Sequence, residues 1–154
     1  MAILAATLIP AVKGTDGDFS FEVTPGPQGA PCVRYDGPSE SGGNCFVAVG
    51  RGGWALEAES TRSKHDVVFF GAAIGQARAI RIGKAATIRG LRWSKRYHLR
   101  FFARRVPRKA LQVERNKIVA LDKRGRLLGR QHYREHGGYG RCDGLWDRKH
   151  CVNK

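Results

Sequence analysis

The chain lacks acidic side chains over a long stretch: no aspartate or glutamate occurs between Asp66 and Glu114. Inside that gap, positions 78–109 carry 12 lysines and arginines together with large apolar residues such as Trp93 and Phe101. A solvated basic tail would lack those apolar residues. The stretch is therefore interpreted as folded structure that presents positive charge on one side.

Long apolar runs are also missing. The most apolar segment, residues 1–12 (MAILAATLIPAV), is far shorter than the roughly 20 residues a membrane-spanning helix needs. It has no positively charged start of the kind that opens a signal peptide, so it is either the remnant of one or a mature N-terminus. We predict no membrane span. We interpret residues 1–12 as an N-terminal strand that is packed in its own sheet or exchanged with a neighbouring copy in a homo-oligomer.

Motifs for known chemistry are absent as well. The sequence contains no P-loop, no G-x-S-x-G and no G-x-G-x-x-G that opens a helix. We therefore predict a protein that is not an enzyme and uses no cofactor or metal. A small basic secreted nuclease is kept as an alternative, with His132 or His136 as general base and nearby arginines such as Arg130 holding phosphate. The H-E-x-x-H order of a zinc protease does not occur.

Four cysteines are present, and none is in a C-x-x-C pair. Three connectivities are open, and local pairing, Cys32–Cys45 and Cys142–Cys151, is the prediction because each bridge would close one glycine-rich loop. A competing metal site would combine Cys142, Cys151 and His150 with a distant histidine. Paired cysteines imply an oxidising compartment, and hence a secreted or cell-surface protein.

Sustained helical periodicity is missing, whereas short segments that alternate apolar and polar residues are frequent. With 20 glycines and 6 prolines between them, these segments predict nine or ten short strands. The expected fold class is all-β: one domain, 1–154, built as a two-sheet antiparallel sandwich of immunoglobulin-like or jelly-roll-like type. Residues 131–154 are expected to form a loop-rich tail pinned by a disulfide. The expected strands include 19–23, 32–35, 45–49, 54–60, 67–70, 77–82, 95–106, 117–122 and 126–130, with 36–44 as a plain loop.

Residues 95–106 (KRYHLRFFARRV) alternate most clearly. Tyr97, Leu99, Phe101 and Ala103 are predicted to face the core, with an arginine-rich face opposite them that includes Phe102. Phe102 is either a core residue covered by arginine stems or an aromatic on the charged face, where it would be an interface anchor or be covered by a second chain. The predicted binding residues are Arg92, Arg96, Arg100, Phe102, Arg104 and Arg105.

Trp93 lies among the same arginines. It is either part of a stacking platform for single-stranded nucleic acid or sugars, or a core residue covered by arginine stems.

Charge is unevenly distributed along the chain. Residues 1–60 carry three basic and seven acidic groups, whereas residues 61–154 carry 25 basic and six acidic groups, and the total is +15. A field of that size attracts polyanions or acidic protein surfaces. We expect a structural, assembly or binding module whose arginine-rich face meets an acidic partner, such as the acidic N-terminal part of another copy. The alternative is a binder of nucleic acid or of an acidic polymer.

Several segments between Cys45 and Arg130, namely GWALEAES, DVVFFGAA, HLRFFARRVP and IVALDKRGRLLGR, resemble sandwich-type β domains of exported actinobacterial proteins. In those domains a D-x-x-G-R-x-L-G-R hairpin closes the fold. The use of 19 arginines against 9 lysines also suits a GC-rich genome. The resemblance implies export and a sandwich, and it brings neither an activity nor functional residues.

Overall fold

The computed structural model describes residues 12–16, 19–38, 40–51, 54–62, 66–111 and 116–133. These residues are almost entirely strands, and every strand pair is antiparallel, which confirms the all-β prediction. The strands are β1 (Lys13–Asp16), β2 (Phe19–Pro25), β3 (Pro31–Asp36), β4 (Ser41–Cys45), β5 (Leu56–Arg62), β6 (Asp66–Ile74), β7 (Ala79–Ile82), β8 (Ala86–Arg89), β9 (Arg92–Ser94), β10 (Leu99–Pro107), β11 (Asn116–Leu121) and β12 (Leu127–Tyr133). Two single 3-10 turns, η1 (Pro27–Gly29) and η2 (Arg108–Ala110), complete the described elements. No helix in these ranges has the length and hydropathy that crossing a membrane requires.

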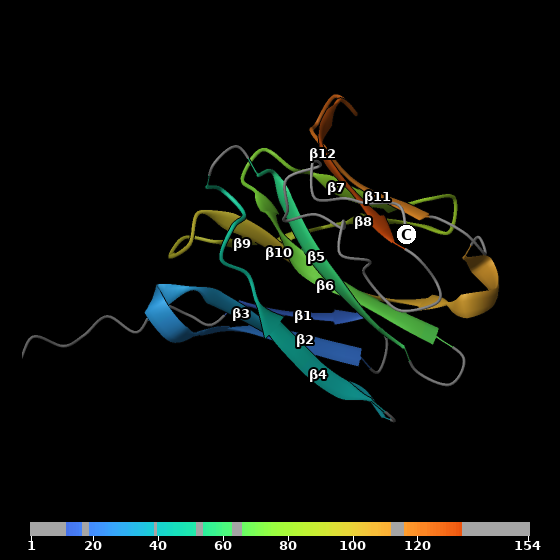
Figure 1. The fold of residues 1–154 in the computed structure, drawn as a ribbon, viewed down its shortest axis with the longest axis horizontal. Helices are drawn as coiled ribbons and strands as arrows, with labels where there is room; N and C mark the ends of the chain where they lie inside the picture. The colour runs from blue at the N-terminus through green and yellow to red at the C-terminus, as the bar shows by residue number, and fades with distance from the viewer. Residues whose placement is uncertain are drawn as a thin grey trace, which may run out of the picture.

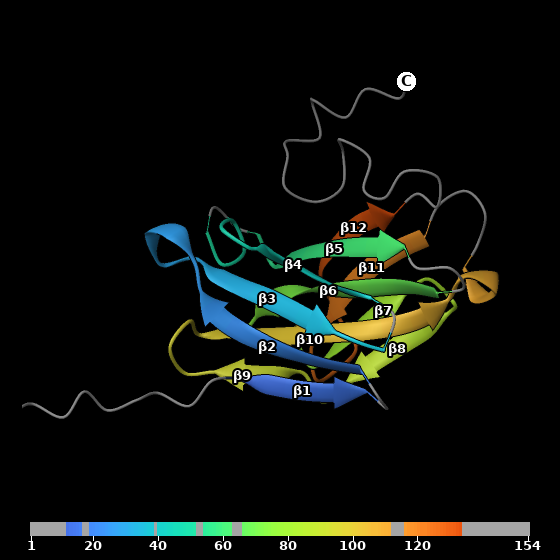
Figure 2. The same cartoon turned by 90° about the horizontal axis from the view of Figure 1, so that it is seen from below.

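The strands form three sheets: sheet A (β1-β2-β3-β4), sheet B (β5-β6-β10-β9) and sheet C (β12-β11-β7-β8). Figure 1 shows them as layers, with sheet A in blue below, sheet B in the middle and sheet C above. In the view from below, β2 and β3 of sheet A run across β10 and β6 of sheet B (Figure 2). The predicted sandwich is therefore confirmed, but it contains three sheets where we expected two.

Sheet B occupies the middle because its central strands are apolar on both faces. In β6, all seven residues from Val67 to Ala73 are buried, which confirms the prediction that this strand is central. Phe70 belongs to the core shared with sheet A, and Phe69 belongs to the core shared with sheet C. Neighbouring side chains of one strand point to opposite faces, so burying both of them requires a cover on each side of the sheet.

Strand β10 lies beside β6, and its two faces are likewise covered. Leu99, Phe101 and Ala103 pack toward sheet A, as the alternation predicted for them. Phe102 packs into the core on the sheet C side and is only 2% exposed. The expectation that Phe102 lies on an exposed, arginine-rich flank is therefore wrong, because sheet C covers that flank. The strand also begins later than predicted, since positions 95–98 form a turn.

The segment 36–49 differs most from the sequence prediction. Strand β4 (Ser41–Cys45) covers residues 41–44, which were expected as loop, and pairs with β3, whereas the strand expected at 45–49 ends at Cys45 and leaves Phe46 and Val49 buried in irregular backbone. Glycine makes the strand possible: a Cβ at Gly43 would lie 2.4 Å from the carbonyl oxygen of Val33. Two adjacent glycines normally indicate a turn, but here they permit close approach of the backbone to its neighbour.

The predicted Cys32–Cys45 disulfide is present and joins two directly paired residues of β3 and β4. The predicted hairpin after residue 116 is also present, and the carboxylate of Asp122 accepts hydrogen bonds from the turn N–H groups of Arg124 and Arg126 at 2.8 and 2.9 Å. Strand β12 continues to Tyr133, so residues 131–133 are not part of a loop-rich tail.

Four expectations concern segments outside the described residues: the N-terminal strand, the Cys142–Cys151 bridge, the competing metal site with His150, and His136 of the nuclease alternative.

Candidate anion-binding site

The candidate site lies at the end of sheet B, where β6 finishes and β10 begins. An open pocket of about 540 Å³ is formed there by the turn after β6, the edge strand β9, the turn at 95–98 and the first residues of β10. Its lining residues are Gly75, Gln76, Arg78, Trp93, His98 and Arg100. Not one of them carries a negative charge. The pocket is therefore a cationic and aromatic cavity.

Trp93 is positioned by the short hairpin between β9 and β10. It pairs with Arg100 across the two strands, and the turn is closed by hydrogen bonds from the Tyr97 N–H to the Ser94 hydroxyl (3.2 Å) and from the His98 N–H to the Ser94 carbonyl (2.9 Å). The indole is 44% exposed and lies against the turn after β6. A Cβ at Gly75 would approach its Cζ3 to 3.0 Å, so any larger residue at this position would displace the indole.

Two guanidinium groups converge on one backbone oxygen. Arg78 Nη1 donates to the carbonyl of Gly75 at 2.7 Å and to that of Ala77 at 3.0 Å, while Arg100 Nε donates to the carbonyl of Gly75 at 2.9 Å. Within the described part of the chain, neither arginine has a carboxylate partner. Burial, and then the charge of Arg78, lower the pKa of Arg100. Two like charges are thus held together without compensation, an arrangement that a bound anion would relieve.

The aromatic rings complete the site. The guanidinium carbon of Arg100 lies 5.3 Å from the centre of the Trp93 ring, in a cation–π arrangement. The imidazole of His98 meets the indole edge-on, with ring centres 5.9 Å apart. Each arginine uses only one nitrogen in these backbone bonds, and a guanidinium has five N–H donors. The site is therefore equipped to bind an anion next to an exposed indole.

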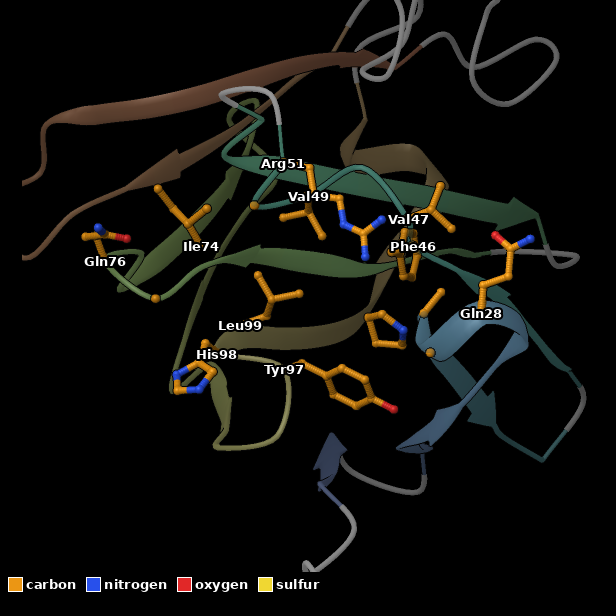
Figure 3. Close-up of a pocket in the computed structure, with 15 residues that line it drawn as sticks. Gln28, Phe46, Val47, Val49, Arg51, Ile74, Gln76, Tyr97, His98 and Leu99 are labelled. Carbon is orange, nitrogen blue, oxygen red and sulfur yellow. The ribbon is translucent and has the colours of Figure 1, made fainter.

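A second pocket, of about 390 Å³, adjoins the first and shares Gly75, Gln76 and His98 with it (Figure 3). It is lined by the apolar side chains of Phe46, Val49, Ile74 and Leu99. Figure 3 shows the Arg51 side chain reaching from the 46–51 loop into this space. The second pocket therefore has a mixed lining, in which these apolar side chains stand beside polar ones such as Gln28, Arg51 and Tyr97.

The 46–51 loop that forms one wall of the second pocket is held by a buried carboxylate. Glu57 is only 3% exposed, and its Oε2 accepts hydrogen bonds from the N–H groups of Ala48 (3.0 Å) and Val49 (3.1 Å). Burial raises the pKa of Glu57, while the hydrogen bonds from the loop oppose that rise. Glu57 thus holds the 46–51 loop in position through these two hydrogen bonds.

The structure brings only one of the six predicted binding residues into the cationic pocket, namely Arg100. Arg92 and Arg96 are exposed, and Arg96 lies over the Tyr97 ring at 5.4 Å. Arg105 is directed toward sheet A instead, where its Nε lies 3.0 Å from a carboxylate oxygen of Glu40.

Of the other predicted residues, Arg104 is half-buried and Phe102 is in the core. Sequence reasoning missed Arg78 and His98, because the bond from Arg78 to the Gly75 carbonyl and the contact of His98 with Trp93 depend on the two turns. For Trp93 itself, the exposure of the indole favours the platform alternative over the core alternative.

A second cationic surface covers the outer face of sheet C. Four exposed basic residues alternate with the buried residues Ile80, Ile82, Ile88, Ile118 and Ala120, and so point away from the core: Arg81, Arg89, Lys117 and Arg130. Over residues 79–89 and 116–133, sheet C and its hairpin turns carry eight basic residues and one acid, Asp122. Sheet A differs: residues 13–16, 19–38 and 40–45 carry two basic and four acidic residues. Positive charge is thus concentrated on one outer layer.

Among the described residues, no group of three histidine, cysteine or acidic side chains is placed to hold a metal ion. His132 of the nuclease alternative lies on β12. The chain matches no protein-family model, no curated protein and no solved structure.

Proposed function

We propose that this protein is a non-enzymatic binding module for polyanions. The observation that carries the proposal is the convergence of Arg78 and Arg100 on the carbonyl of Gly75, in an open pocket without a carboxylate. Arginines that only stabilise a fold are usually paired with acids, as Arg105 is with Glu40. Guanidinium groups left with free donors beside solvent are suited to phosphate or carboxylate groups of a ligand.

The second cationic surface, on the outer face of sheet C, indicates that the ligand is extended. Sheet C presents Arg81, Arg89, Lys117 and Arg130 over four strands, an area much wider than one small anion could contact. A linear polyanion can neutralise several such charges at once, and the release of its counterions drives binding. The disulfide between Cys32 and Cys45 fits an exported protein, so we place this binding outside the cytoplasm.

Binding is favoured over assembly because the proposed assembly contact used the arginine face of β10. Sheet C covers the middle of that face, where Phe102 is buried, while its end at Arg100 faces a pocket. Exchange of the 1–12 strand between copies stays a prediction that size measurement at several concentrations would check.

The proposal is tested by titrating the protein into a fluorescent polyphosphate chain at several salt concentrations. We expect the logarithm of the affinity to fall steeply with the logarithm of the salt concentration. The double variant Arg81→Gln/Arg130→Gln should bind more weakly, and its salt slope should decrease by about one for each phosphate group that is no longer neutralised. A matched variant, Lys13→Gln/Arg34→Gln, removes the same charge from exposed positions of sheet A and should behave as the wild type. A flat salt response, or equal weakening in the two variants, would refute the proposal.

A further inference from the structure

We propose that the pocket around Trp93 recognises one unpaired nucleotide of a single-stranded nucleic acid. The base would stack on Trp93, and the phosphate would be bound by Arg78 and Arg100. This inference rests on the proposed polyanion binding and names the class of polyanion. It adds a recognition element that charge alone does not supply.

The exposure of Trp93 is the first argument. The other large aromatic side chains of sheets A and B, such as Phe19, Phe70, Phe101 and Phe102, are buried in the two cores, whereas Trp93 is 44% exposed. The guanidinium of Arg100 lies over one face of its ring and Gly75 lies at its edge, so the indole is held in place rather than free to rotate. A fixed, exposed aromatic ring is what base stacking requires, because every base has a flat π-face.

The position of the two arginines is the second argument. Their bonds to the same carbonyl of Gly75, at 2.7 and 2.9 Å, place both guanidinium groups in the pocket that Trp93 lines, and that of Arg100 lies over the indole. In a nucleic acid, each base is joined through its sugar to a phosphate, so an aromatic surface next to free guanidinium donors matches the repeating unit of the polymer. Polyphosphate and acidic polypeptides supply the charge without a flat ring, and Trp93 would then contribute little.

A single strand is inferred because stacking on a side chain needs a base whose face is free. In a duplex both faces of each internal base are covered by its neighbours, whereas single strands can turn a base outward. The pocket is open and lies at a turn of the sheet edge, where such a base can enter. The cationic outer face of sheet C would then bind further phosphates without reading their sequence.

The test compares three fluorescent ligands of equal charge: a short oligothymidine, the same strand with abasic sugars, and polyphosphate. The wild type should bind the oligothymidine about 5- to 150-fold more tightly than the abasic strand, the range expected for stacking of one base. Trp93→Leu should lose that preference and retain its affinity for the abasic strand. Arg78→Gln and Arg100→Gln should each weaken binding to all three ligands. Trp54→Leu, which replaces a half-buried tryptophan outside the pocket, is the matched control and should keep the preference.

The outcomes separate this inference from the proposed function. If the wild type binds all three ligands equally, the polyanion function stands and nucleotide recognition is refuted. If Trp93→Leu weakens binding to the oligothymidine and the abasic strand by the same factor, Trp93 has only a structural role and the inference fails. If none of the ligands binds with a salt-dependent affinity, both proposals fail. Circular dichroism of each variant confirms that the sheets are intact.

Discussion

Truncating two neighbouring phenylalanines of β10 tests the three-layer arrangement directly. Phe101 is fully buried on the side of sheet A, and Phe102 is 2% exposed on the side of sheet C. A buried phenylalanine replaced by alanine costs about 3–5 kcal/mol, from reduced burial and from the cavity left behind. Because both faces of sheet B are covered, we expect Phe101→Ala and Phe102→Ala to lower the free energy of unfolding by similar amounts in that range.

A two-layer fold would give a different result for one of the two phenylalanines. In a two-layer sandwich one of two consecutive strand residues faces water, and its truncation would cost less than about 0.5 kcal/mol. Leu127→Ala provides the matched control, because this large apolar side chain is 54% exposed and its removal should cost little.

Urea unfolding followed by circular dichroism supplies the free energies, and an unchanged m-value shows that the folded state keeps its compactness. The expected decreases are a large share of a typical stability of about 5–15 kcal/mol, so Phe101→Leu and Phe102→Leu serve as milder versions, each expected to cost less than about 1.5 kcal/mol. A large decrease at Phe101 with almost none at Phe102 would show that sheet C does not cover sheet B, and the layered fold would be refuted.

Three further predictions follow from single contacts. Burial raises the pKa of Glu57 in the folded state. Its contribution to stability is therefore fully present below the ordinary pKa, where the carboxyl group is neutral, and is lost as the pH rises through the raised value. Glu57→Gln keeps an oxygen acceptor for the loop and should melt at a higher temperature than the wild type at pH 7, with the difference shrinking toward pH 4; a difference that grows on acidification would contradict this. Replacing Cys32 and Cys45 by alanine opens a loop with a sequence separation of 13 and should lower the free energy of unfolding by about 3 kcal/mol in denaturant titrations, whereas an unchanged midpoint would show that the bridge constrains nothing. Gly75→Ala forces the Trp93 ring to move, since the new methyl group would lie 3.0 Å from Cζ3, so tryptophan emission should shift and oligothymidine affinity should fall; if neither changes, the close contact does not position the ring.

Local patterns were sufficient to predict the strands that alternate or are wholly apolar. The continuous run at Val67–Phe70 predicted a central strand, and the D-x-x-G-R segment after Leu121 predicted a hairpin, because both signals lie within a few neighbouring residues. Strand β4 was missed because its two glycines resemble a turn unless the neighbouring strand is known. The third sheet was missed for a similar reason, because coverage of both faces of sheet B depends on how strands that are distant in the sequence pack together.

The candidate site could be predicted only in part. An unusual concentration of arginine and aromatic residues in one stretch was visible in the sequence, and it contains Arg100, Trp93 and Arg78. Which arginines are paired, buried or free depends on partners far away in the chain. Arg100 is joined to the carbonyl of Gly75, 25 residues earlier, while Arg105, only five positions further on, is directed toward Glu40 of another sheet.

The position of sheet B has a consequence for how this architecture can acquire new specificity. A layer enclosed above and below offers the surroundings only its loops and the exposed end where Trp93 and Arg100 lie, and substitutions in the buried middle of its strands would weaken packing. Variation in what the protein recognises would therefore come mainly from that end and from the connections at 75–78 and 95–98, with the enclosed layer as a fixed base. Exchanging those two short connections between related chains should transfer ligand preference without disturbing the scaffold.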